Sequence, residues 1–83
     1  MALVKGFIPA DRKSLRVQPT QVTCRYAVDD LQGGQKLLQL DTHGSNDREI
    51  PGKVSQTLQF DETSARALWE ILGREFGFKA GSR

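Results

Sequence analysis

The chain has 83 residues and a formal net charge of +2, with 37% hydrophobic and 27% charged residues. This length allows one domain with a small core, and the composition is globular rather than disordered. There is no apolar run long enough to cross a membrane and no apolar N-terminal segment of the signal-peptide kind, so we expect a cytoplasmic protein. The single cysteine, Cys24, excludes a disulfide within the chain and a multi-cysteine metal site.

Positive charge is concentrated near the N-terminus, whereas residues 29–50 are net acidic. Arg12, Lys13 and Arg16 fall in a polar stretch with two prolines. This composition predicts a basic, partly flexible segment over residues 1–20. Such a segment either contacts nucleic-acid phosphates or is an ordinary solvated surface.

A hairpin is predicted next. The stretch QVTCRYAVDD alternates between apolar and polar positions, as a half-buried strand does. Gly33 and Gly34 predict the turn, because both tolerate positive φ, and KLLQLDTH is the return strand. The apolar face of this hairpin consists of Val22, Cys24, Tyr26, Val28, Leu38 and Leu40. We expect Cys24 and Tyr26 to be buried there, with Arg25 on the opposite face.

A further strand and the only long helical pattern follow. KVSQTLQFD predicts a strand whose polar face consists of Ser55, Thr57 and Gln59. Residues 61–77 predict a helix, with Asp61 as its N-cap and Gly77 as its stop. The apolar stripe of this helix consists of Ala65, Leu68, Trp69, Leu72 and Phe76. We expect Phe60 and Trp69 to lie in the core.

These elements predict a single α+β domain over residues 1–83. Residues 21–60 form an antiparallel sheet of three to five strands, and the helix at 61–77 packs on its apolar face. The opposite face of the sheet stays open. Because so small a chain buries little surface, association into a dimer is attractive.

We expect neither catalysis nor a cofactor nor a metal site. His43 is the only histidine and stands near Asp41, Ser45 and Asp47, but catalytic triads are assembled from distant segments rather than from neighbours. One histidine is also a poor basis for a metal site. The Gly-Gly pair matches neither a P-loop nor a dinucleotide-binding fingerprint.

Two segments allow alternative interpretations. ALVKGFI, residues 2–8, is an edge strand or a tail that docks on the sheet edge of a partner. GSNDREIPGK, residues 44–53, is a long hairpin loop, and its second possible use is to present basic side chains at the edge of a binding groove. A nucleic-acid groove on the sheet would use the basic residues on or beside the strands, namely Arg25, Lys36, Arg48 and Lys53.

The run LLQLDTHGSNDREIPGKVSQTLQFDETSARALWEIL resembles the transcriptional positive cofactor four family of single-stranded DNA binders. The shared pattern is a strand, a polar loop, Pro51, an alternating strand opened by Lys53, and a capped helix that bears Trp69. The same run also resembles short uncharacterised bacterial proteins, from which no function can be carried over.

The family resemblance implies a four-stranded curved sheet and a homodimer joined through the helices, whose apolar residues here are Leu68, Trp69, Leu72 and Phe76. It also implies that unpaired DNA binds along the strands, with Lys53 on a phosphate and Lys36 and Arg48 lining the groove. One hypothesis is therefore a dimer that binds single-stranded DNA or RNA and assists transcription, replication or repair. The other is a protein-interaction or assembly module that binds no nucleic acid.

Overall fold

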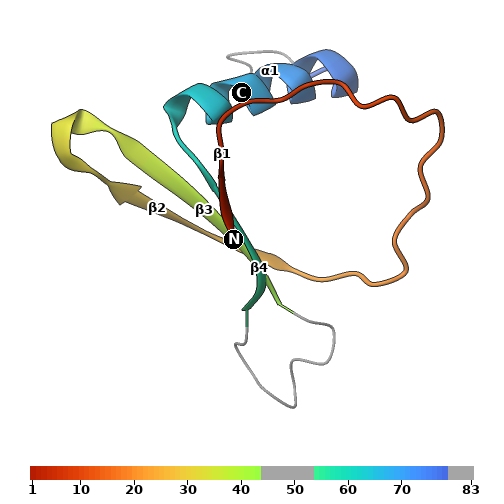
Figure 1. Ribbon diagram of the computed structural model, residues 1–83, viewed down its shortest axis with the longest axis horizontal. Coiled ribbons are helices and arrows are strands. Elements are labelled where there is room, and N and C mark those ends of the chain that lie inside the picture. Colours follow the sequence, from red (N-terminus) through yellow and green to blue (C-terminus); the bar gives the residue numbers. More distant parts are fainter. Residues whose placement is uncertain (44–53, 79–83) are drawn as a thin grey trace.

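The computed structural model describes residues 1–43 and 54–78. Its elements, in chain order, are β1 (Ala2–Val4), β2 (Cys24–Asp30), the 3₁₀ turn η1 (Gln32–Gly34), β3 (Lys36–His43), β4 (Val54–Phe60) and α1 (Glu62–Phe76). The four strands form one open sheet in the order β1-β4-β3-β2, and α1 lies across one end of it (Figure 1). The predicted α+β class with one C-terminal helix is confirmed.

The sheet is mixed rather than wholly antiparallel. β3 runs antiparallel to β2 and to β4, as predicted, but β1 runs parallel to β4. β1 and β2 are therefore the two edge strands and point in the same direction, so the chain must return across the molecule between them. Residues 5–23 make this return as an extended segment, called here the arc. Its start contacts the sheet and the beginning of the helix through Phe7 and Lys5, and the rest curves away from both (Figure 1).

The hairpin between β2 and β3 turns where the sequence predicts. Gly33 and Gly34 have φ angles of 78° and 76°. This is the left-handed region, which a side chain would make unfavourable. The Leu31 N–H donates to the Gln35 carbonyl at 2.7 Å and closes the turn.

α1 has the caps that its sequence predicts. The Asp61 carboxylate accepts the Ser64 N–H at 3.0 Å, and the Ser64 hydroxyl accepts the Asp61 N–H at 3.1 Å, which completes a reciprocal capping box. At the other end Gly77 has a φ of 77°, and its N–H donates to the Gly73 carbonyl. The helix contacts β3 and β4.

The core is smaller than the sequence predicts. Phe60 is buried as expected and stacks on Phe7 with ring centroids 6.4 Å apart, but within residues 1–43 and 56–78 no other hydrophobic side chain is buried. The expectation that Cys24, Tyr26 and Trp69 are buried is wrong: Cys24 is exposed, Tyr26 is 75% exposed and Trp69 is 50% exposed. The reason is position, because β2 is an edge strand and α1 packs mainly over the other two long strands.

Candidate interaction surface

Apolar side chains from the sheet and the helix share one exposed surface. The register aligns Tyr26 with Leu40 and Leu58, and Val28 with Leu38 and Phe60, so these side chains form two rows on one face of the sheet. We call the exposed part of this face, together with the exposed stripe of α1, the helix-side surface; it consists of Tyr26, Val28, Leu58, Trp69, Leu72 and Phe76. Exposed apolar side chains that form a contiguous patch, unlike ones scattered singly, are typical of an interaction site.

A cleft of about 640 Å³ opens between α1 and the sheet on this surface. Its apolar lining includes Val28, Leu38, Phe60 and Trp69. The Arg66 guanidinium lies 5.8 Å from the Trp69 ring centroid, a distance at which a cation is attracted to the ring. The indole of Trp69 therefore forms part of the wall of the cleft and stays half exposed.

The stripe of α1 that the sequence assigns to a core or dimer contact is only partly used by its own sheet. Leu68 is half-buried. Leu72 is 36% exposed and Phe76 is 68% exposed, with the Phe76 ring stacked on Phe78. The helix thus keeps apolar side chains available for a contact outside its own chain, which is what the dimer hypothesis requires.

The opposite face of the sheet carries a row of hydrogen-bonded polar side chains, called here the polar ladder and formed by Gln39, Asp41, Thr57 and Gln59. The Thr57 hydroxyl donates to Asp41 Oδ1 at 2.6 Å, and the Gln39 amide donates to the same carboxylate at 3.2 Å. The Gln59 amide donates to the Gln39 carbonyl oxygen at 2.8 Å. The Thr57 hydroxyl and then the Gln39 amide lower the pKa of Asp41, so a carboxylate is held ionised at the centre of this face.

The predicted nucleic-acid-binding residues do not converge on one groove. Arg25 lies on the face of the polar ladder. In the β2–β3 register it is directly across from Asp41. Lys36 lies on the other face and bonds to Asp30 at 2.8 Å, an interaction that raises the pKa of Lys36. Arg48 and Lys53, and the whole stretch that would have presented them, lie outside the described residues.

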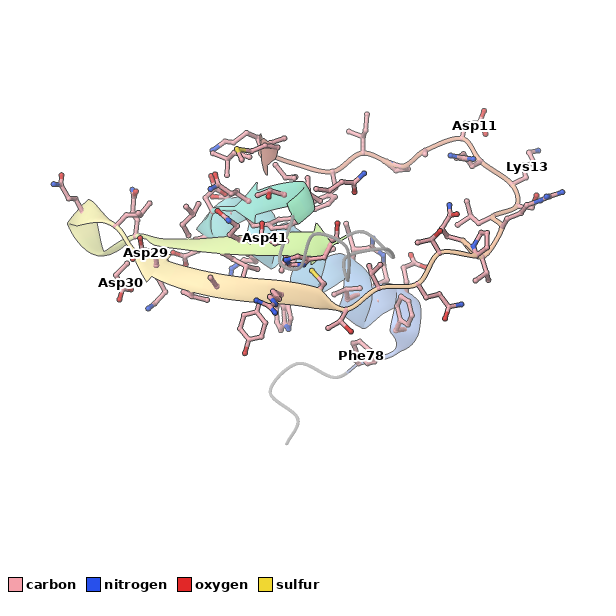
Figure 2. The ribbon with its side chains drawn as sticks, turned by 90° about the horizontal axis from the view of Figure 1, so that it is seen from below. Asp11, Lys13, Asp29, Asp30, Asp41 and Phe78 are labelled. Carbon is pink, nitrogen blue, oxygen red and sulfur yellow. The ribbon has the colours of Figure 1, made fainter. Side chains whose placement is uncertain are left out.

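The remaining predicted cations lie on the arc. Arg12, Lys13 and Arg16 are all exposed there. Figure 2 shows Lys13 at one end of the molecule and Asp29 and Asp30 at the other. The basic arc and the sheet are therefore two separate surfaces rather than the two sides of one groove.

The outer edge of β2 is a feature that the sequence alone did not reveal. Among the described strands β2 pairs only with β3, and all seven of its residues are exposed. Backbone N–H and C=O groups on the far side of this strand therefore have no described strand to bond to. Alternation identifies a strand, but it does not tell where in the order of the sheet the strand will lie.

No protein-family model, curated protein or solved structure matches the chain. Within residues 1–43 and 54–78, no group of three His, Cys, Asp or Glu side chains is placed to hold a metal ion. The same ranges contain no helix of the length and apolarity needed to cross a bilayer.

Proposed function

We propose that the protein is an assembly module that associates with a second copy of itself and thereby covers apolar surface that it leaves open alone. One observation carries the proposal: the apolar stripe of α1 stays open, with Trp69 50%, Leu72 36% and Phe76 68% exposed.

The core is small for a chain of this length. Burying one phenylalanine side chain contributes about 3 kcal/mol. Ordering the backbone costs about 1 kcal/mol for every residue. Phe60 and the half-buried leucines of the sheet are thus a weak core for so many ordered residues, and the helix-side surface holds the apolar area that is missing from it. A second copy is the partner available wherever the chain is made.

The test uses Trp69, the only tryptophan of the chain. Association that covers the helix-side surface removes the half-exposed indole from water, so its fluorescence should move to shorter wavelength as the protein is concentrated from nanomolar to high micromolar. Phe76→Asp, which places a charge on this surface, should abolish the shift. Thr63→Asp adds the same charge to the exposed first turn of α1, and this variant should still show the fluorescence shift. Emission typical of an exposed indole at every concentration would contradict the proposal.

Single-stranded DNA or RNA binding is a second candidate function. It is supported by the exposed cations Arg12, Lys13 and Arg16 on the arc, an extended segment that can follow a phosphate backbone. Phosphate contacts release counterions, so replacing the three cations with alanine should reduce the slope of log affinity against log salt by about 2.

The measurement is fluorescence anisotropy of a labelled single-stranded oligonucleotide at several salt concentrations, with duplex DNA as the competitor. Lys36→Ala is the matched control, because that lysine lies at the hairpin end and is paired with Asp30. An unchanged salt slope in the triple variant would rule out the arc as the binding segment.

A further inference from the structure

We propose that β2 pairs antiparallel with β2 of a second copy, about a two-fold axis at Ala27, and so joins two four-stranded sheets into one. The inference rests on the self-association proposed above and adds to it a second contact, the outer edge of β2, with a defined register.

The first support is the shape of the strand. β2 pairs with β3 over seven consecutive residues without a bulge. The other edge strand, β1, has three residues. Long, regular edges are the ones that pair with another chain, and proteins that avoid such pairing shorten, kink or charge them. β2 is neither short nor kinked, so its charges decide whether it repels a second copy or accepts it.

The second support is that these charges are complementary in one register. When two identical strands pair antiparallel over their full length, Ala27 lies opposite its own copy. Arg25 then lies opposite Asp29 of the second copy, and the reverse pair forms on the other side of the axis. A shift of two residues, the smallest that keeps the same faces together, sets Arg25 opposite Ala27 or Leu31 instead. The longest pairing is thus also the one that matches the charges.

The third support is that neither Arg25 nor Asp29 has an ion-pair partner among the described residues, although Arg25 faces Asp41 across the β2–β3 register. Arg25 and Asp29 are exposed and form no ion pair in the described part of the chain, whereas their neighbour Asp30 is bonded to Lys36. Opposite charges that face each other across a strand pair stabilise it, and like charges destabilise it. Arg25 and Asp29 therefore favour this pairing instead of blocking it.

The backbone is oriented to suit the same register. The Leu31 N–H bonds toward β3, and donors alternate along a strand, so Tyr26 and Val28 direct their N–H and C=O groups to the outer edge. In the proposed pair these two residues exchange backbone hydrogen bonds between copies. Arg25 and Asp29 then meet at a position without backbone hydrogen bonds, where the strands approach most closely, at about 4.5 Å between Cα atoms.

The pairing also begins to cover the helix-side surface. A two-fold axis perpendicular to the sheet keeps the helices of both copies on the same side. Tyr26, 75% exposed, packs beside Val28 of the second copy, and the Val28 of each copy, 55% exposed alone, also lines the cleft at Trp69. Contact at the edge therefore covers the part of the helix-side surface that lies on β2.

The test is charge reversal, read by sedimentation velocity as the dimer dissociation constant. Arg25→Asp and Asp29→Arg should each raise this constant about tenfold or more, because each replaces two attractive pairs with two like-charged ones. The double variant Arg25→Asp/Asp29→Arg restores both pairs and should dimerise as the wild type does. Arg25→Asp/Asp11→Arg has the same net charge but changes the arc instead, and should stay as weak as Arg25→Asp.

Mixing the two single variants gives a second, independent readout. A chain with two aspartates and a chain with two arginines at these positions should form a heterodimer more tightly than either forms a homodimer. A double variant as weak as the single variants, or single variants as tight as wild type, would overturn the β2 pairing. If the Trp69 shift persists in that case, self-association uses another surface; a wild type that is monomeric at every concentration overturns both proposals.

Discussion

Asp41 and Thr57 show how a single hydrogen bond sets the charge of the polar face. The buried Thr57 hydroxyl is the main cause of the lowered pKa of Asp41. Thr57→Val keeps the shape and removes the donor, so it should raise the pKa of Asp41. Carbon-detected NMR titration of the carboxyl group measures this directly. Thr57→Ser retains a hydroxyl and should keep the low pKa; equal values in both variants would show that the hydroxyl is not the cause.

Asp61 links the arc to the helix. The Lys5 ammonium, followed by the backbone N–H and hydroxyl of Ser64, lowers the pKa of Asp61 from 3.8 to about 2. The folded chain therefore binds this proton less tightly than the unfolded chain, and the stability that the carboxylate contributes is complete above pH 3.8 and lost as the pH falls toward 2.

Asp61→Asn should consequently flatten the fall of the melting temperature across that pH range, because the amide keeps an oxygen for the cap but has no charge to lose. Circular dichroism melts in steps of pH measure the slope. Asp11→Asn, on the exposed arc, is the control and should follow the wild type. An unaltered slope in Asp61→Asn would contradict the assigned role of the carboxylate.

At the scale of the element, α1 depends on the capping box at its start. Ser64 is fully buried, and its hydroxyl satisfies the Asp61 N–H. Ser64→Ala leaves that donor unpaired and should lower the free energy of unfolding by about 1 kcal/mol. Thr63→Ala, at an exposed position of the same turn, should change it by less than about 0.5 kcal/mol. Urea unfolding of both variants makes the comparison, and equal losses would argue against the cap.

The elements that sequence predicts well are those governed by local chemistry. The caps of α1 and the Gly33-Gly34 turn are confirmed, because each depends on residues adjacent in the chain. The parallel pairing of β1 with β4 was not predictable, since it joins segments more than fifty residues apart. Tyr26 was wrongly expected in the core for the same reason: alternation gave the correct face, but the order of strands left that face uncovered.

For the candidate surfaces, too, the sequence predicts what depends on neighbouring residues and does not predict what depends on strand order. The stripe of α1 was visible in the spacing of its apolar residues, and the polar ladder was visible in part as the polar faces of two strands. The outer edge of β2 appears only once the sheet is assembled. The basic residues of the sequence suggest one binding groove. In the structure Arg25, Lys36 and the arc lie on different surfaces, because strand order and the long return of the chain separate them.

At the scale of the whole molecule, stability depends on very few buried groups. Phe60→Ala removes the only hydrophobic side chain that is buried within residues 1–43 and 56–78, at a cost of about 3–5 kcal/mol. That is comparable to the whole stability of a small domain, so we expect the variant to be unfolded by circular dichroism. Phe78→Ala removes an equally large ring that is 64% exposed, and it should remain folded. A folded Phe60→Ala would place the stabilising core elsewhere.

A second copy of the chain is proposed to cover the apolar surface that one copy leaves exposed. Sedimentation equilibrium across a wide concentration range tests it most directly, because it measures mass without assuming where the contact lies. Self-association predicts a weight-average mass that rises from the 9.2 kDa of one chain toward that of a dimer. A mass of one chain at every concentration, in a sample that is folded by circular dichroism, would contradict it.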